Sequence, residues 1–252
     1  MLKKLLVSLV LLLVPVLAMA GEVALSDVVQ ALEAPFKKET PAQQRITDFS
    51  AEFAQESFIS SIRRIQRGAG SVRFRFVAHA AAESPTAQFR WDYRQPDVQE
   101  IISDGKTMWV YLPENKQVVE SDISRIDEAQ GENPVTFLSG LGDLSRDFDI
   151  LWASEAIDKD GNYHLLLRPH RESQLFHEME VAVSQAAVAD WLARGSAGQQ
   201  FPILGTRVTD AQGNRTAILF EDIEINRNLD AALFTFNRPA DVELITPDQL
   251  AF

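Results

Sequence analysis

Apolar and polar residues alternate along several short stretches of this chain, with the period of two that is typical of half-buried β-strands. One clear stretch carries Phe49, Ala51 and Phe53 at alternate positions, separated by more polar residues. A second stretch, residues 72–76, alternates valine and phenylalanine with arginine in the same way. Each of them predicts a strand with one apolar and one polar face.

A longer run that begins at Phe89 predicts a β-meander with aromatic residues on successive strands. Phe89, Trp91 and Tyr93 alternate with charged residues, and Pro96 ends the strand because proline cannot donate to a sheet. Asp104-Gly105 then predicts a two-residue hairpin turn. That turn would give three cross-strand pairs: Ile101 with Met108, Gln99 with Val110, and Glu100 with Trp109.

Three segments predict helices. Residues 26–38 carry an apolar stripe that Ser26 can cap, Asn133-Pro134 is typical of a helix start, and residues 186–193 precede a terminating Gly195. The second helix would contain Phe137, Leu138 and Leu141.

Because hairpin turns recur without βαβ alternation, the chain is expected to be α+β, mainly β, with one antiparallel sheet in a single domain. Further strands are expected at residues 148–152, 163–167, 179–183, 204–208, 217–225 and 233–236, and an irregular loop at 78–87.

The N-terminal residues 1–20 predict a cleaved secretory signal peptide. Lys3 and Lys4 precede an apolar stretch, and Ala18-Met19-Ala20 is a small-x-small cleavage site. The residue after the cut is Gly21, which cannot be lipidated as a cysteine would be. We therefore expect a mature domain of residues 21–252 in the periplasm of a Gram-negative bacterium.

The composition narrows the possible partners. The chain has no cysteine, which excludes disulfides and thiolate metal sites. Without Lys3 and Lys4 it has 22 basic and 36 acidic residues, so nucleic acid is an improbable partner. Such an acidic surface would also be repelled by anionic lipid headgroups, although the surplus charge is equally consistent with simple solubility. A monomer is expected.

Sequence patterns of common enzymes are absent: there is no G-x-S-x-G, no P-loop, no Rossmann glycine fingerprint and no H-E-x-x-H. Acidic residues are plentiful, but no pair of them stands out as a glycosidase pair. An exported hydrolase that uses such carboxylates remains an alternative, and it would need a polar cleft open to water. We expect no enzymatic activity and no cofactor.

Two groups of residues are weak candidates for a metal site. His170 and His177 lie close to acidic residues, but their spacing fits no zinc or facial-triad pattern, and a solvated surface is expected. Asp158, Asp160 and Asn162 resemble a calcium loop without the bidentate glutamate that should follow. A plain hairpin turn is the expected structure there, and no metal is expected.

The aromatic residues on the strands allow two interpretations. Phenylalanine and tryptophan on one strand face most often form ordinary core. A large twisted sheet tends to curl, however, and only a few short helices are available to fill its interior. A partly filled interior would be an apolar pocket, and alternation alone would place Phe53 and Phe74 in its lining.

Several motifs occur in order along the mature chain: Phe49-x-Ala51-x-Phe53-x-Gln55, the run from Phe89-Arg90-Trp91 to Ser103-Asp104-Gly105-Lys106, the Asn133-Pro134 helix, and Phe234-x-Phe236. Their order resembles the periplasmic outer-membrane lipoprotein carrier (LolA-type) family. The resemblance implies an unclosed antiparallel β-barrel of about eleven strands, with short helices as a lid over an apolar cavity. It also implies a carrier that takes acylated lipoproteins from an inner-membrane ABC transporter and passes them to an outer-membrane receptor.

The resemblance also assigns roles to residues by motif position. The lid would carry Phe137, Leu138 and Leu141. The family's Arg-Pro pair, whose arginine latches the lid, is replaced here by Ser84-Pro85, and the helical stretch 186–198 is an addition without a family role. A periplasmic binding protein or sensor of the same fold, for another amphiphile such as a glycolipid or a free lipid, is an alternative. The cavity lining implied by the motifs consists of Phe89, Trp91, Ile101, Met108 and Val110.

Overall fold

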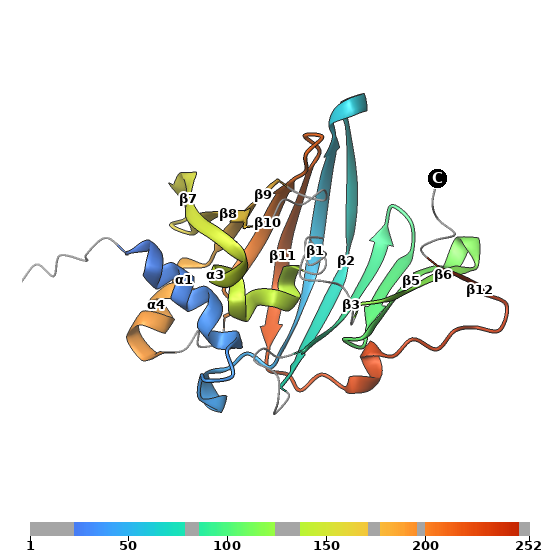
Figure 1. Ribbon diagram of the computed structural model, residues 1–252, viewed down its shortest axis with the longest axis horizontal. Helices are drawn as coiled ribbons and strands as arrows, with labels where there is room; N and C mark the ends of the chain where they lie inside the picture. Colours follow the sequence, from blue (N-terminus) through green and yellow to red (C-terminus); the bar gives the residue numbers. More distant parts are fainter. Residues whose placement is uncertain (1–22, 79–85, 124–136, 171–176, 196–199, 247–252) are drawn as a thin grey trace, which may run out of the picture.

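One sheet of twelve strands dominates the fold (Figure 1). The computed structural model describes residues 23–78, 86–123, 137–170, 177–195 and 200–246. The predicted signal peptide, the Asn133-Pro134 helix start and most of the 78–87 loop lie outside these residues. The strands are β1 (Asp48–Ile59), β2 (Arg64–Val77), β3 (Thr86–Gln95), β4 (Gln99–Ser103), β5 (Thr107–Leu112), β6 (Gln117–Asp122), β7 (Phe148–Ile157), β8 (Tyr163–Pro169), β9 (Glu178–Val183), β10 (Ile203–Thr209), β11 (Arg215–Ile225) and β12 (Glu243–Ile245).

The sheet is open, with the order β12-β6-β5-β4-β3-β2-β1-β11-β10-β9-β8-β7. Neighbouring strands pair antiparallel except β12 and β6, which are parallel. The predicted unclosed, mainly antiparallel architecture is therefore confirmed, with twelve strands where about eleven were expected. Only the short edge strand departs from the antiparallel pattern.

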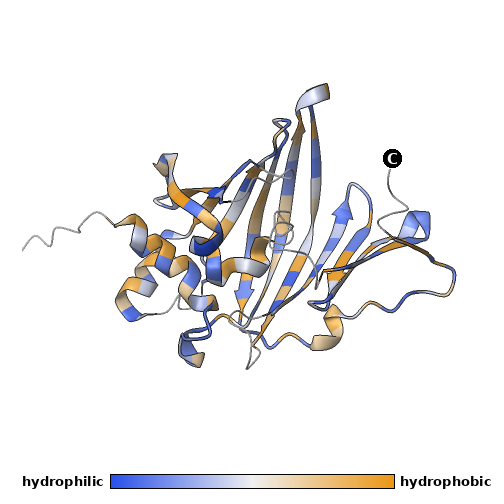
Figure 2. Ribbon diagram, in the orientation of Figure 1, coloured by the Kyte–Doolittle hydropathy of each residue, from blue (hydrophilic) through white to orange (hydrophobic). Residues whose placement is uncertain are grey.

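Hydrophobic and hydrophilic residues alternate along many of the strands (Figure 2), and this alternation gives the sheet two chemically different faces. Phe49, Phe74 and Trp91 are buried on what we call the inner face, which also packs against the helices. Arg73 and Arg90, one position away along their strands, lie on the opposite, outer face. Successive side chains of a strand point to opposite sides, so one buried face follows directly from the period of two in the sequence.

Short helices cover part of the inner face. In Figure 1, α1, α3 and α4 gather over one side of the sheet, which is formed by β7, β8, β9, β10, β11 and β1. Strands β4, β5 and β6 stand clear of these helices. No helix in the described part of the chain is long and apolar enough to cross a membrane. The helices are α1 (Leu25–Glu33), η1 (Ala34–Phe36), η2 (Ala42–Gln44), η3 (Ser60–Ile62), η4 (Pro113–Asn115), η6 (Leu138–Asp143), α3 (Leu144–Asp147), α4 (Gln185–Arg194) and η7 (Ala231–Phe234).

Two helix predictions are confirmed with different details. The helix expected at 26–38 starts at Leu25, and its N-cap is Ala24, so the proposed cap by Ser26 is wrong. Its α-helical part stops before Pro35, which lacks an N–H and disfavours a helical residue before it. The helix predicted before Gly195 is α4, and Gly195 ends it in the left-handed conformation, with φ of 70°.

The hairpin at Asp104-Gly105 forms, but its predicted register is wrong by two residues. Ile101 pairs with Val110, and Ser103 pairs with Met108. The reason lies in the turn, where the Asp104 carboxylate accepts the backbone N–H groups of Lys106 and Thr107, both at 2.8 Å. An aspartate that accepts N–H groups of its own turn can shift the first cross-strand pair beside the turn by one residue along both strands. A shift of two keeps every side chain on its expected face.

The C-terminal prediction is wrong in a different way. Residues 233–236 were expected to form a strand, but Phe234 ends the short helix η7. Phe236 then packs on Trp109 and Tyr111 of the outer face, with ring centroids 6.2 and 5.4 Å apart. The chain next reaches β12, which the sequence analysis missed. Phenylalanine spacing alone cannot separate a strand from a segment that packs across another strand.

Candidate functional site

The inner face carries a continuous row of aromatic rings. Phe49 and Phe74 stack with centroids 5.1 Å apart, and Phe74 stacks on Phe89 at 5.4 Å. Phe53 meets Trp91 edge-on at 4.9 Å. Cross-strand register explains the contacts, because Phe74 pairs with Phe49 on one side and with Phe89 on the other. Such pairs stabilise a sheet beyond the area they bury, by about 0.5–1.5 kcal/mol each.

A glycine makes room for this row. Gly70 of β2 lies directly opposite Phe53 of β1. A Cβ atom at position 70 would come within 2.1 Å of the Asp92 carbonyl oxygen and 2.9 Å of the Phe53 ring. The Phe53 ring therefore lies over backbone that only glycine can provide. This close approach lets three strands bring their largest side chains together.

The seven predicted lining residues share the inner face, but they differ in burial. Phe53, Phe74, Phe89 and Trp91 are 0–3% exposed, and Ile101 is 9% exposed. Met108 and Val110 of β5 are half-buried and pack against the same core. The first four are thus enclosed, whereas the β5 side chains remain accessible. Their role as the lining of a cavity stays a prediction.

The predicted lid residues lie against the same core. Phe137, Leu138 and Leu141 are buried, the last two in η6. Gly142 of η6 approaches η1 so closely that a Cβ atom there would be 3.3 Å from the Phe36 carbonyl oxygen. In the described residues these side chains are packed, and no open lid is seen there.

A buried carboxylate that sequence reasoning missed joins two of these helices. Glu33, at the end of α1, is buried and accepts the backbone N–H of Ser145 at 2.6 Å. It also pairs with Lys37 Nζ at 2.8 Å. Ser145 lies in the first turn of α3, where an N–H lacks a helical partner, so the carboxylate acts as a cap from another segment. A glutamate in a predicted amphipathic helix gave no signal of this role.

Trp91 has an unusual polar group. Its Nε1 is buried and has no hydrogen-bond partner among the described residues, and the rings of Phe53, Phe74 and Phe220 surround the indole. A buried donor without an acceptor costs about 1–3 kcal/mol. Within the part of the chain that the structure describes, this donor of the aromatic row is unused.

The inner face becomes polar toward one end of the strands. Tyr93 donates its hydroxyl to Gln55 Oε1 at 2.8 Å, Gln55 donates to Ser57 Oγ at 3.1 Å, and Ser57 and Thr216 are 3.2 Å apart. We call these four residues the polar end. Burial raises the pKa of Tyr93 to about 12, so the phenol stays neutral at physiological pH. A pocket of about 220 Å³ opens here and is lined by Gln55, Tyr93 and Gln99.

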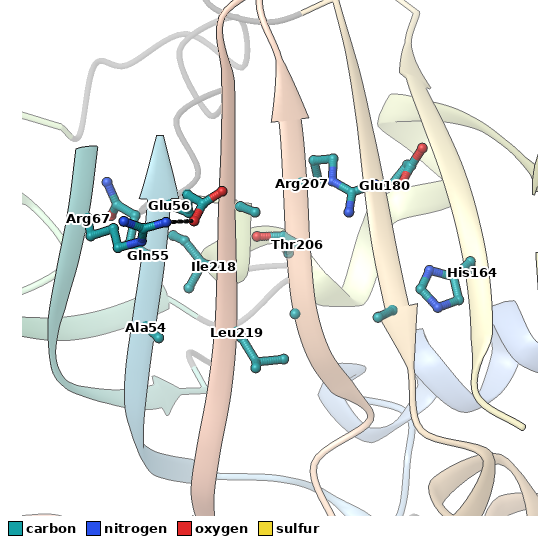
Figure 3. Close-up of a pocket in the computed structure, with 13 residues that line it drawn as sticks. Ala54, Gln55, Glu56, Arg67, His164, Glu180, Thr206, Arg207, Ile218 and Leu219 are labelled. Carbon is teal, nitrogen blue, oxygen red and sulfur yellow. Dashed lines mark hydrogen bonds and ion pairs between the residues drawn. The ribbon is translucent and has the colours of Figure 1, made fainter. Parts of the chain in front are cut away.

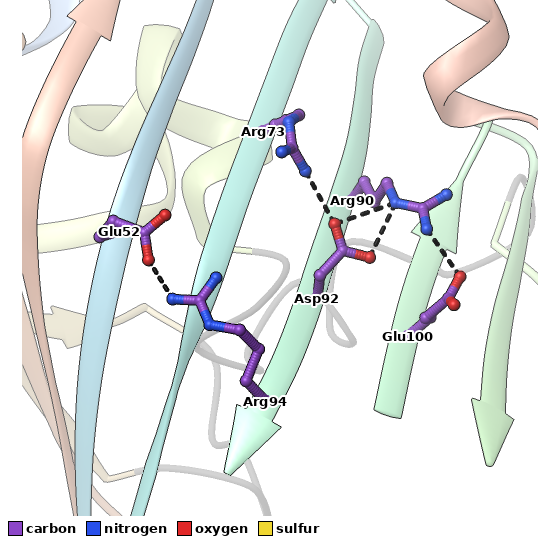
Figure 4. A network of polar contacts seen from close by, with 6 residues as sticks. All are labelled: Glu52, Arg73, Arg90, Asp92, Arg94 and Glu100. Atoms are coloured by element: carbon purple, nitrogen blue, oxygen red, sulfur yellow. Dashed lines mark hydrogen bonds and ion pairs between the residues drawn. The ribbon is translucent and has the colours of Figure 1, made fainter. Parts of the chain in front are cut away.

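The outer face carries charges in compensated pairs. Asp92 accepts Arg73 at 2.7 Å and Arg90 at 2.8 Å, Arg90 also reaches Glu100 at 2.7 Å, and Arg94 pairs with Glu52 (Figure 4). The network crosses four neighbouring strands. Partly exposed pairs of this kind each contribute about 0–1 kcal/mol, and they leave little unbalanced charge.

A second pocket, of about 390 Å³, lies on the outer face over β8 to β11 and β1 (Figure 3). Its floor is made by small residues, including Ala54 and Gly205, beside the exposed Leu219. Arg207 at its rim pairs with Glu180 at 2.8 Å. No serine or cysteine nucleophile beside a base lines this pocket.

The weak metal candidates form ordinary surface structure. The Asp158 carboxylate accepts the N–H groups of Asp160 and Asn162, both at 2.9 Å, in the turn between β7 and β8, which confirms the predicted hairpin turn. His170 is partly exposed and lies 3.1 Å from Asp149. Within the described ranges, no three His, Cys, Asp or Glu residues are placed to hold a metal ion.

Comparison with known proteins places the chain in a family. The family model for outer membrane lipoprotein carrier protein LolA matches residues 44–237. An outer-membrane lipoprotein carrier protein of Chromohalobacter salexigens is 26% identical, over 91% of this chain and 95% of the relative. Another, from Pseudomonas aeruginosa, is 28% identical over 93% and 96%. A solved LolA superfamily structure from Nitrosomonas europaea is 12% identical, with a TM-score of 0.41 over 85% of this chain and 99% of that one. Because the family model matches most of this chain, the chain belongs to the LolA family of outer membrane lipoprotein carrier proteins.

Proposed function

We propose that this chain is a periplasmic carrier that shields the acyl chains of lipoproteins and shuttles them from the inner to the outer membrane. The observation that carries the proposal is the continuity of the apolar inner face, which extends from the buried aromatic row to half-buried Met108 and Val110. An acyl chain can begin its contact at the accessible β5 side chains and displace the packed helices as it enters.

The transfer of an acyl chain through water favours apolar, flexible contacts of the kind that the inner face provides. Each CH₂ that leaves water contributes about 0.8 kcal/mol, so a long acyl chain faces a barrier on the order of 10 kcal/mol if it crosses the periplasm unshielded. The carrier must also release its cargo without ATP. Phenylalanine, methionine and valine provide non-directional contacts that hold an acyl chain without fixing it. The unused Nε1 donor of Trp91 would suit an ester or amide carbonyl beside that chain.

The carrier we propose is a monomer and not an enzyme. Its cargo is an acylated lipoprotein, delivered by an inner-membrane ABC transporter and passed to an outer-membrane receptor. The 1–20 segment would direct export. The cavity lining would consist of Phe53, Phe74, Phe89, Trp91, Ile101, Met108 and Val110, with Phe137, Leu138 and Leu141 as the lid. The buried Glu33, which holds α3 by the Ser145 N–H, would serve as the latch in place of the missing arginine.

The test measures binding of a triacylated lipopeptide to the mature protein and transfer of a lipoprotein to outer-membrane vesicles. Val110→Glu places a charge at the accessible part of the inner face and should abolish binding while the fold persists. Leu219→Glu is the matched control, because Leu219 is exposed on the outer face. Phe89→Glu is unsuitable, since that side chain is fully enclosed and the variant would unfold.

Two outcomes would contradict the proposal. If Val110→Glu and Leu219→Glu bind the lipopeptide equally well, the inner face is not the binding site. If mass spectrometry of the purified native protein finds a glycolipid or a free lipid and the lipopeptide does not displace it, the cargo is another amphiphile.

A further inference from the structure

The hairpin of β1 and β2 extends beyond its neighbours and ends in a tip of unusual composition (Figure 1). We call residues 57–67 the β1–β2 tip, with the sequence S-F-I-S-S-I-R-R-I-Q-R. Ile62 is 61% exposed and Ile65 is 47% exposed. Arg63, Arg64 and Arg67 are exposed as well, and the tip contains no acidic residue. Large apolar and basic side chains therefore share one projecting surface.

Exposed isoleucines alone would mean little, because single apolar residues are common on protein surfaces. The charge around them is the informative feature. The whole chain carries a net charge of −12, yet this tip carries three arginines. A local positive charge on a strongly acidic protein selects for an anionic partner at that point.

The arginines at the end of the tip are free to pair with an external anion. Among the residues that the structure describes, no acidic side chain pairs with Arg63 or Arg64. Arg67 lies 3.1 Å from Glu56, but both side chains are at least half exposed, and such a pair contributes little. On the neighbouring turn, Asp210 is occupied by the N–H groups of Gln212 and Asn214.

The tip is held in a fixed shape by that turn. Asn214 accepts the Ser60 N–H at 2.8 Å and donates its amide to Asp210 at 2.7 Å. The guanidinium of Arg215 lies 5.1 Å from the centre of the Phe58 ring, which adds a fourth cation at the base of the tip. Arg63 closes the loop in the left-handed conformation, with φ of 50°. Because the side chains are already displayed, little ordering would be needed on binding.

We infer that the β1–β2 tip docks on an anionic lipid bilayer. Arg63, Arg64 and Arg67 would bind headgroup phosphates, while Ile62 and Ile65 enter the boundary between headgroups and acyl chains. A narrow tip suits a bilayer better than a protein, because a stable protein interface buries about 800 Å² on each side. The inference does not rest on the carrier function, since an empty protein should bind as well.

The test uses the mature protein and vesicles of phosphatidylcholine with or without phosphatidylglycerol, measured by sedimentation. Binding should require phosphatidylglycerol and weaken as salt rises, because salt screens the arginines. Two basic residues near such a surface together strengthen binding about thirtyfold, so R63Q/R64Q should lower affinity by about that factor. I62S/I65S should also lower it while leaving every charge in place.

The matched control is R168Q/R207Q, which removes the same charge from exposed positions on β8 and β10. It should bind vesicles like the native protein. An equal loss in the control would overturn the inference, because general charge would then explain the binding. Absence of native binding at low salt would also overturn it. So would tip variants that bind vesicles normally but no longer bind protein-containing inner membranes, since the tip would then dock on a protein.

Discussion

The two halves of the inner face are filled in different ways. On the side of β8 and β9, the inner-facing Leu165, Met179 and Val181 are completely buried in the core that α1 and α4 help to form. On the side of β5, Met108 and Val110 remain half-buried, and in Figure 1 the helices α1, α3 and α4 of the described residues stand clear of this side. One half behaves as the ordinary core of a domain. The other half still has apolar surface to offer a ligand.

The enclosed side chains of the inner face form core, whereas the role of the half-buried side chains as the lining of a cavity stays a prediction. A side chain that is fully enclosed by its neighbours stabilises the fold, whereas a half-buried apolar side chain can gain contacts when a ligand binds. The aromatic row lies at the border between the halves. We therefore expect substitutions to separate into those that affect stability and those that affect binding.

The largest effect should come from the enclosed row. Phe74→Ala removes a fully buried ring that stacks on Phe49 and Phe89, and it should lower the free energy of unfolding by about 3–5 kcal/mol. Urea unfolding of the mature protein measures the change, and Phe74→Leu supplies a milder variant. Phe58→Ala, at the half-exposed tip, is the control and should cost far less. Equal costs would show that the row is not core.

Much of this row could be predicted from the sequence, because a period of two fixes which residues share a face. The same rule explains why an error of two residues in the β4–β5 register left Ile101, Met108 and Val110 on the correct side. Burial within that face could not be predicted in the same way. It depends on which strands lie beneath α1 and α4, and that is set by contacts between segments far apart in the sequence.

Glu33 illustrates the part that sequence could not provide. Its partner, Ser145, is 112 residues away and contributes only a backbone N–H, which leaves no trace in residue identity. The edge strand β12 was missed for a related reason, since it is three residues long and pairs with β6 in parallel. Patterns report local periodicity, and these features depend on distant backbone groups.

The next largest effect should follow loss of the Glu33 carboxylate. Glu33→Ala leaves the Ser145 N–H without an acceptor and should lower stability by about 1.5–3 kcal/mol, since the lost hydrogen bonds involve a charged group. Hydrogen exchange at the Ser145 amide should speed up more than exchange in β2. Glu39→Ala is the control at an exposed site of the same segment. Unchanged exchange at Ser145 would exclude Glu33 as the latch of this helix.

A smaller stability effect is expected in the accessible half. Met108→Ser should lower the free energy of unfolding by only about 1 kcal/mol, because the side chain is half-buried. Its affinity for a triacylated lipopeptide should fall about tenfold, as expected from the loss of one apolar contact surface. Titration calorimetry and urea unfolding of the same variant separate the two. A large loss of stability with normal binding would assign Met108 to the core.

The smallest effect concerns the polar end, where the inner face stops being apolar. Burial raises the pKa of Tyr93 to about 12 from an ordinary value of 10.0, so its contribution to stability is complete below pH 10 and is lost as pH rises toward 12. The chain has three tyrosines, and absorbance of tyrosinate can follow them. Tyr93→Phe should remove the component that ionises near pH 12 and weaken the alkaline loss of stability. If native Tyr93 instead ionises near pH 10, water reaches the hydrogen bond between the Tyr93 hydroxyl and Gln55 freely. The polar end of the inner face would then be open to solvent.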